Sequence, residues 1–461
     1  MGTPSKDFNS RLKAALLGTS DRQLVFLGNF DVENAWAEGE AGLPRVGFAA
    51  SNALVNRMDE FSLLLAGDGD CVVLKAAPDP GYLDYLRGLG IRLPRVLPVR
   101  SGDPQATVTQ DALADPAVRD ALRALAGTAQ LAPHGVSRVE ERLAEETGVP
   151  LAAPSEAVCK AVNSKIYSRR LADEAGLRQA RGWTADTLAE FDVAVSGARA
   201  LLDRGVDVVV KDAFGVSGKG ITVVRDTRRL YQLHRMVTRR AERSGSDRVS
   251  LLIEEWVAKE RDLNYQFTLG RDGTAHFDFV KEALTEGGVH QGHRFPAALT
   301  GEQTEQIERT CATLGKRLAA DGFHGVVGVD AMLDPEGGLY PMVEINARNN
   351  MSTYQCRLQE TFVPEGHFAL ARHYGLRLPD RLPFDRLHGA LRGALLSTPG
   401  EAGLVINNFA TVNASAPEDG TGTFEGRLYG LIVARSTEEI AVIDKEITGR
   451  LAVLQEENHR A

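Results

Sequence analysis

The sequence predicts an α/β protein of several domains, and three observations support this prediction. The chain has 461 residues, which is too long for one ordinary hydrophobic core and fits about two to four domains. Its first third alternates short apolar runs with helix-like stretches, as in a parallel sheet covered by helices. After Ser155 the apolar runs instead follow one another across glycine-rich turns, which indicates antiparallel hairpins.

Residues 1–154 are predicted to form the N-terminal α/β domain. The apolar runs at 24–30 and 71–76 predict buried strands, residues 82–90 predict a helix that stops at a glycine, and residues 91–99 predict the next strand. Since the two element types alternate, we expect a parallel sheet here.

Residues 155–385 are predicted to be a second unit, opened by Ser155 as a helix N-cap. A helix is expected at 165–175, followed by β-rich chain. The expected strands lie at 207–211, 221–224 and 250–257, and at 263–269 and 274–283 around the turn at 270–273.

An amphipathic helix is expected at 302–320, followed by a hairpin of the strands GVVGVDAML and LYPMVEIN. Residues 386–461 are predicted to form a C-terminal α/β domain. It contains strands near 405–414 and 426–435, and a terminal helix from about Thr437.

The composition excludes several classes of function. The formal net charge of −9 argues against nucleic acid as the main partner. The four cysteines are widely spaced, which predicts free buried thiols rather than a disulfide framework or a metal site. No apolar run reaches the ~20 residues that cross a membrane, and the first 20 residues do not resemble a secretory signal. We therefore expect a cytoplasmic protein without a membrane partner.

A glycine-rich loop follows the strand that ends at Lys211. Glycines let backbone N–H groups approach phosphate oxygens closely, and Lys211 would add a cation there. The spacing does not match a Walker A loop. A glycine-rich hairpin is by itself more often a simple turn. The loop residues are Gly215, Ser217, Gly218, Lys219 and Gly220.

The strand ending at Glu254, Trp256 and Val257 could offer backbone groups to an adenine edge. A carboxylate shortly afterwards, Asp262 or Glu260, could accept ribose hydroxyls. The competing interpretation is an acidic strand end that faces water.

The hairpin after the amphipathic helix carries the strongest pattern. Glu344 and Asn346 are two residues apart and share a face, and an odd number of turn residues, such as 335–337, would bring Asp330 to the same face. These oxygen ligands suit Mg²⁺, whereas a solvated polar hairpin does not explain the apolar flanks. Arg348 follows and could brace a transferring phosphoryl group.

In this order, Lys165, Lys211, the glycine loop, EEWV, Asp330 and EINAR resemble the ATP-grasp family across residues 155–385. The resemblance implies a pre-ATP-grasp domain, a glycine-loop lid at about 165–256, and a metal-binding core at about 257–385. It implies that Lys165 and Lys211 hold the α- and β-phosphates, and that Gly215–Gly220 cover the γ-phosphate, which Arg348 also contacts. The resemblance further implies that Glu254, Trp256 and Val257 meet adenine. Two Mg²⁺ ions, or Mn²⁺, would be held by Asp330, Glu344 and Asn346.

The stretch KEALTEGGVHQGHRFPAAL is similar to a loop of members that form acyl-phosphates. This makes Arg294 a candidate for the substrate carboxylate, with His290 and His293 as weaker candidates. The outer regions resemble the peptide ligases of pheganomycin-type antibiotic biosynthesis. The resemblance implies ADP-forming ligation of a small carboxylate to an amine or peptide. A smaller-scope amino-acid or dipeptide ligase, a non-catalytic nucleotide binder and a homodimer stay open.

Overall fold

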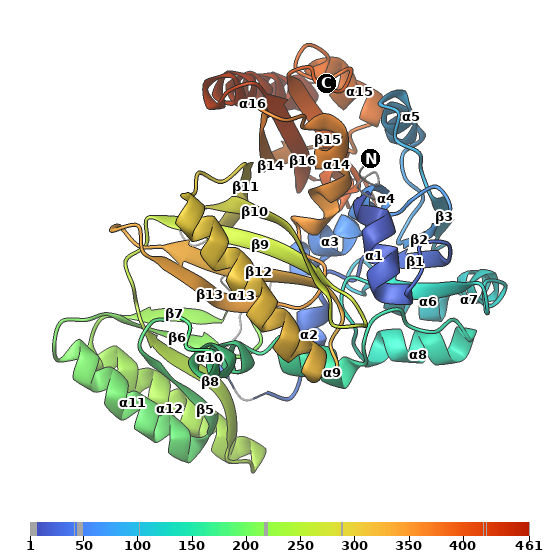
Figure 1. Cartoon of the computed structure of the whole chain (residues 1–461). Coiled ribbons are helices and arrows are strands. Elements are labelled where there is room, and N and C mark those ends of the chain that lie inside the picture. The colour runs from blue at the N-terminus through green and yellow to red at the C-terminus, as the bar shows by residue number, and fades with distance from the viewer. Residues whose placement is uncertain are drawn as a thin grey trace, which may run out of the picture.

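The computed structural model describes residues 7–40, 42–43, 49–100, 102–215, 220–286, 289–417, 419–420 and 422–460. Three sheets organise these residues (Figure 1). A four-stranded sheet belongs to the N-terminal region, a second four-stranded sheet forms the lid, and an eight-stranded sheet runs from the hairpin at residues 325–346 to the last strand.

The N-terminal sheet is parallel throughout, with strand order β3-β2-β1-β4, as the alternating pattern predicted. Strands β1, β2 and β4 are mostly buried because helices cover both faces, whereas the edge strand β3 is partly exposed. The elements are α1 (Phe8–Leu17), β1 (Gln23–Leu27), α2 (Val32–Trp36), α3 (Ala49–Asn56), η1 (Arg57–Phe61), α4 (Ser62–Leu65), β2 (Cys71–Leu74), α5 (Pro80–Gly88), β3 (Arg95–Pro98), α6 (Val108–Ala114), α7 (Pro116–Arg123), β4 (Ala129–Pro133) and α8 (Arg138–Thr147).

Two helices, α9 (Glu156–Val162) and α10 (Lys165–Glu174), lead into the lid. Ser155 occupies the N-cap position of α9 as predicted, but its side chain makes no capping hydrogen bond. Ser164 does cap α10, since its hydroxyl accepts from the Ile166 amide.

The lid is an antiparallel sheet of order β5-β8-β6-β7 with two long helices on one side (Figure 1). Leucine, valine and alanine side chains from both helices fill its core. Its elements are β5 (Gly182–Thr187), α11 (Leu188–Leu202), β6 (Val208–Asp212), β7 (Ile221–Val224), α12 (Thr227–Ser244) and β8 (Arg248–Glu255).

The large sheet has the order β13-β12-β9-β10-β11-β14-β16-β15. Helix α13 covers one face with Ile307, Cys311, Leu314 and Leu318, the stripe that the sequence predicted. The elements are β9 (Arg261–Leu269), β10 (Ala275–Glu286), β11 (Val289–Phe295), α13 (Gly301–Ala320), β12 (Gly325–Leu333), β13 (Leu339–Asn346), η2 (Thr353–Gln355), α14 (Cys356–Phe362) and β14 (Phe368–Leu378).

The same sheet continues across residue 385, because β14 pairs with β16 along its whole length, from Phe368 opposite Ala434 to Leu378 opposite Phe424. The final elements are α15 (Phe384–Leu391), β15 (Gly403–Asn408), η3 (Ala410–Asn413), β16 (Phe424–Ala434) and α16 (Thr437–Arg460). The predicted strand at 405–414 therefore ends at Asn408 and gives way to a 3-10 turn.

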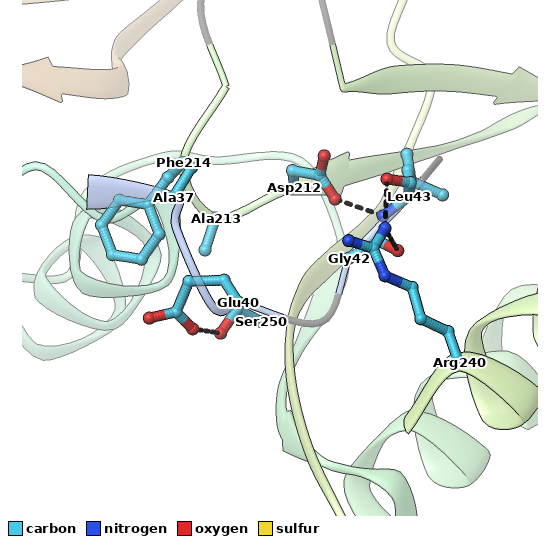
Figure 2. A pocket seen from close by; sticks show the side chains of 9 residues that line it. All are labelled: Ala37, Glu40, Gly42, Leu43, Asp212, Ala213, Phe214, Arg240 and Ser250. Carbon is cyan, nitrogen blue, oxygen red and sulfur yellow. Dashed lines mark hydrogen bonds between the residues drawn. The ribbon is translucent and has the colours of Figure 1, made fainter. Parts of the chain in front are cut away.

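A short segment of the N-terminal region, residues 37–40 and 42–43, reaches the lid, and we call it the strap. Leu43 is 3% exposed and belongs to the lid core, and its amide donates to Asp212 Oδ1 at 2.6 Å (Figure 2). Glu40 accepts from Ser250 at 2.6 Å and pairs with Lys160 at 2.8 Å. The strap thus joins the N-terminal region to the lid.

The four cysteines are free and buried, as predicted. Among the described residues, no helix combines the length and apolar character needed to span a membrane.

Candidate functional site

Four polar residues form one row across the large sheet. Glu344 on β13 lies opposite Asp330 on β12, Asp330 lies opposite Asn264 on β9, and Asn264 lies opposite Lys281 on β10. Directly paired residues project to the same side of a sheet. The predicted convergence of Asp330 and Glu344 is therefore confirmed, and the turn between their strands has an odd length, residues 334–338.

Both carboxylate oxygens of Asp330 accept hydrogen bonds from amides. Asn264 donates to Oδ1 at 2.9 Å and Asn346 donates to Oδ2 at 3.1 Å. Burial and the nearby charge of Glu344 raise the pKa of Asp330 to about 6, against the opposing effect of these amides and of Arg348.

These residues fit a divalent cation. Besides burial, the negative charge of Glu344 raises the pKa of the neighbouring Asp330. A cation between the two carboxylates would offset this repulsion. Asn264 Oδ1 is buried without a hydrogen-bond partner among the described residues. No cluster of three or more His, Cys, Asp or Glu with metal-site geometry occurs in the described part of the chain. Such a site would therefore depend on amide and phosphate oxygens in addition to Asp330 and Glu344.

Lys165 connects this row to the glycine-rich loop. Its Nζ lies 2.6 Å from Glu344 Oε1 and donates to the Gly215 carbonyl at 2.8 Å. The side chain is only 5% exposed. The ammonium group is thus held at the point where the loop begins, next to the carboxylate pair.

Lys211 and Glu254 form an ion pair on neighbouring strands of the lid, with 2.6 Å between Nζ and Oε2. Arg169 of α10 donates to the other oxygen of Glu254 at 2.9 Å. Burial alone would raise the pKa of Glu254, but the two cations together hold it below its usual range. The carboxylate therefore stays ionised and fixes the direction of Lys211.

The glycine-rich loop is described only at its ends. Ser217, Gly218 and Lys219 lie outside the described residues. At Gly220, φ is +81°, and a Cβ would come within 2.7 Å of Asp212 Oδ2, so this position requires glycine. The Asp212 amide donates to the Gly220 carbonyl at 2.8 Å and closes the loop.

Two of the predicted adenine contacts, Trp256 and Val257, follow β8 directly and are at least partly exposed. Trp256 is 44% exposed, and its amide donates to the Asp207 carbonyl at 2.9 Å. A contact of Trp256 with adenine would therefore use its carbonyl rather than its N–H. Val257 follows directly in the sequence, before β9 begins at Arg261.

Asp262 lies two residues before Asn264 on β9 and so shares the face that carries Asp330. It accepts from Thr285 Oγ1 at 3.0 Å and pairs with Lys259. Glu260 precedes the strand. This placement favours Asp262 over Glu260 as the ribose ligand.

Arg348 lies beside the metal candidates and also reaches the N-terminal region. Its Nη2 donates to Asn346 Oδ1 at 3.0 Å, and its Nε pairs with Glu33 of α2. The side chain is 12% exposed. The guanidinium group is therefore fixed from two domains.

Arg294 is not brought to this row. It lies opposite Glu282, which lies opposite Leu263, on the face that packs against α13. Its closest ionic contact is Glu282, at 3.7 Å. Its neighbour His293 occupies the other face, where Nε2 lies 3.2 Å from Ser352 Oγ. His290 carries no described side chain.

Sequence reasoning missed Asn264, Arg169, Glu33 and Lys281. Asn264 could have been found, because the alternation LNYQFTL places it on the face opposite Leu263 and Tyr265. Arg169 follows Lys165 by one helical turn and so shares its side. The contacts of Glu33 and Lys281 join segments far apart in the chain and left no local signal.

Comparison with known families and structures agrees with this arrangement. Residues 58–149 match the pre ATP-grasp domain family, and residues 164–354 match the family described as carbamoyl-phosphate synthase L chain, ATP binding domain.

Two curated relatives illustrate the range of similarity. The chain is 25% identical over 312 residues to the [butirosin acyl-carrier protein]–L-glutamate ligase of Niallia circulans, covering 68% of each protein. It is 24% identical over 183 residues to the formate-dependent phosphoribosylglycinamide formyltransferase of Methanocaldococcus jannaschii, covering 40% of this chain and 44% of the relative.

Solved structures share the fold. Campylobacter jejuni biotin carboxylase aligns with a TM-score of 0.53 and 11% identity, over 94% of this chain and 95% of the other. Staphylococcus aureus N5-carboxyaminoimidazole synthetase aligns with a TM-score of 0.51 and 12% identity, over 94% and 97%. The chain therefore has an ATP-grasp fold, with a pre-ATP-grasp domain followed by an ATP-binding domain.

Proposed function

We propose that this protein joins a small, amino-acid-like carboxylate to an amine, the N-terminus of a peptide, through an acyl-phosphate, with release of ADP and phosphate. The observation that carries the proposal is the convergence of Lys165, Asp330 and Glu344 at the start of the glycine-rich loop. This arrangement provides cationic and metal-binding groups where a triphosphate would end.

In the first step, a carboxylate oxygen of the acid attacks the γ-phosphorus, the bond to the β–γ bridging oxygen breaks, and ADP leaves. Lys211, held by Glu254, would bind phosphate oxygens, and Arg348 would stabilise charge on the transferring group. A divalent cation bound by Asp330, Glu344 and Asn346 would supply further charge neutralisation.

In the second step, the amine nitrogen attacks the acyl carbon, the carbon–oxygen bond to phosphate breaks, and phosphate leaves as the nitrogen loses a proton. Closure of the lid over the site would protect the acyl-phosphate from water. The lid is already tied to α10 through Arg169 and Glu254, so its position and that of Lys211 would change together.

The test is ADP release with Mg-ATP and a panel of amino-acid-like carboxylates, with hydroxylamine as a surrogate amine. We expect ADP and a hydroxamate in equal amounts with one acid of the panel. ADP formation without hydroxamate across the whole panel would contradict acyl-phosphate transfer. Measurable Mg-ATP binding without ADP formation would favour the non-catalytic nucleotide binder.

A second candidate differs in how a substrate is presented. The Niallia circulans relative is named for an acyl-carrier protein as its substrate. A protein-borne substrate would need a docking surface, whereas a free peptide or amino acid would not.

Dependence of the turnover rate on peptide length separates the peptide ligase from the amino-acid or dipeptide ligase.

A further inference from the structure

Helix α12 on the outside of the lid is strongly basic. It contains six arginines and one acidic residue, Glu242, in a chain whose formal net charge is −9. Leucine, valine and alanine side chains bury the side that faces the lid core. The exposed side carries a stripe of arginines at helical spacing: Arg228, Arg235, Arg239 and Arg243.

These four arginines, which we call the arginine face, make no ion pair with an acidic side chain in the portion of the chain that the structure describes. Elsewhere in the lid, exposed arginines do pair with acids, as Arg225 does with Asp207 at 3.3 Å. A row of like charges on one side of a helix repels itself, which costs free energy that a partner of opposite charge recovers.

Apolar side chains accompany the arginine face. Met236 is 37% exposed and Tyr231 is 39% exposed, although both are large and apolar. Met236 lines a surface groove of about 580 Å³ together with Arg235, Arg239 and Gly42 of the strap. The surface therefore offers both positive charge and apolar contact, a combination that occurs at protein interfaces.

We propose that the arginine face docks an acidic, amphipathic helix of a partner protein that presents substrate to the ligase site. Acidic side chains of that helix would pair with the arginines, and its apolar side would contact Met236, which lines the groove. A long polyanion such as nucleic acid fits less well, because it would extend beyond α12 over a chain that is acidic overall.

The position of the groove connects it to the proposed chemistry. Arg240, on the same helix, donates to the carbonyls of Gly42 and Leu43 at 3.3 and 3.2 Å, and the Leu43 amide donates to Asp212, which follows Lys211 (Figure 2). A partner bound in the groove would thus lie against the segment that anchors the base of the glycine-rich loop. The inference rests on the proposed function for the role of the partner, but not for its binding.

Binding is tested with the full-length protein and a fluorescein-labelled peptide of about 20 residues, designed as a helix with glutamates on one side and leucines on the other. We compare Arg235→Ser/Arg239→Ser/Arg243→Ser with a control of equal charge change, Arg381→Ser/Arg386→Ser/Arg392→Ser, at exposed positions in or next to α15.

We expect the Kd to rise at least about tenfold in the α12 variant only, and the wild-type affinity to fall with salt. Equal losses in both variants, or no binding by the wild type, would overturn the proposal. So would tighter binding of a single-stranded oligonucleotide of equal charge through the same arginines.

Hydroxamate formation from free substrates separates this inference from the proposed function. The α12 variant should keep the wild-type rate with free acid and hydroxylamine, since none of the three arginines belongs to the proposed site. If the wild type binds the peptide through α12 but forms no hydroxamate, the ligase proposal fails and the docking surface stands. A proportionate loss of hydroxamate formation in the α12 variant would contradict a pure docking role.

Discussion

Replacing Glu344 by Gln tests the proposed metal site with little change in shape. Glutamine keeps an oxygen that can accept from Lys165 Nζ, which lies 2.6 Å from the carboxylate, and Lys165 keeps its bond to the Gly215 carbonyl. The ion pair becomes a hydrogen bond from the charged ammonium group to a neutral amide oxygen, which costs about 1 kcal/mol. Part of this is offset, because the Glu344 charge that raises the pKa of Asp330 is removed.

The effect on chemistry should be far larger than the effect on stability. Loss of an anionic metal ligand beside the γ-phosphate should lower kcat by at least about 10³-fold, equivalent to about 4 kcal/mol in the barrier. The melting temperature should change by only about 2–4 °C. Steady-state ADP release over a range of Mg²⁺ concentrations and thermal unfolding measure the two quantities separately.

The control is Glu336→Gln, an exposed position in the turn of the same hairpin, which makes the same change in charge. It should leave both kcat and the melting temperature near the wild-type values. A Glu344→Gln enzyme with kcat within about twofold of the wild type would refute the metal assignment, whatever its stability.

Three further changes test other parts of the site and the fold. Lys211→Ala should raise the Kd for ATP by about 10- to 100-fold in calorimetry, because Glu254 would lose the cation that it directs toward the phosphates; unchanged affinity would contradict the phosphate role. Arg348→Lys should lower kcat about 100-fold and leave ATP affinity nearly unchanged, since a lysine cannot keep the fork-shaped contacts of the guanidinium group; a wild-type kcat would contradict the role of Arg348 at the transferring phosphoryl group. Burial raises the pKa of Glu60 to about 7 from 4.5, so its protonation stabilises the fold fully below pH 4.5, and this contribution of about 3 kcal/mol is lost as the pH rises through 7. Urea unfolding of Glu60→Gln should therefore show a smaller loss of stability between pH 5 and 8 than the wild type, and parallel pH profiles would exclude this cause.

The sequence predicted those elements whose pattern is local. The alternation of apolar residues gave β12 and β13 and the face shared by Asp330 and Glu344, and the helical stripe gave α13. The sequence did not predict β14, because this strand mixes Arg372 and His373 with apolar residues. Its neighbours in the sheet, β11 and β16, are also not its neighbours in a local hairpin pattern. The continuous eight-stranded sheet follows from that pairing and could not be seen in any one segment.

The site shows the same division between local and distant signals. Lys165 stands out at the start of a helix and Lys211 near the end of a strand, and Asp330 and Glu344 stand out as carboxylates inside mainly apolar strands. Arg348 was assigned to phosphate from its place after Asn346, and its ion pair with Glu33, more than 300 residues away, has no trace in the local pattern. The strand register places Arg294 on the face opposite to the one that carries Asp330. The sequence could not predict this, since a shift of one residue in the register changes the face that a side chain occupies.

The strap has a consequence for the order in which the protein is made. Leu43 and Asp212 are 169 positions apart, and Leu43 completes the apolar interior of the lid. During synthesis the strap leaves the ribosome long before the lid strands that contact it. The lid therefore reaches its final packing only when these later strands pack against the strap, which was made first. A fragment that starts near residue 155 would be made without this plug. Its lid would present the vacated apolar surface to water, and it should be prone to aggregation.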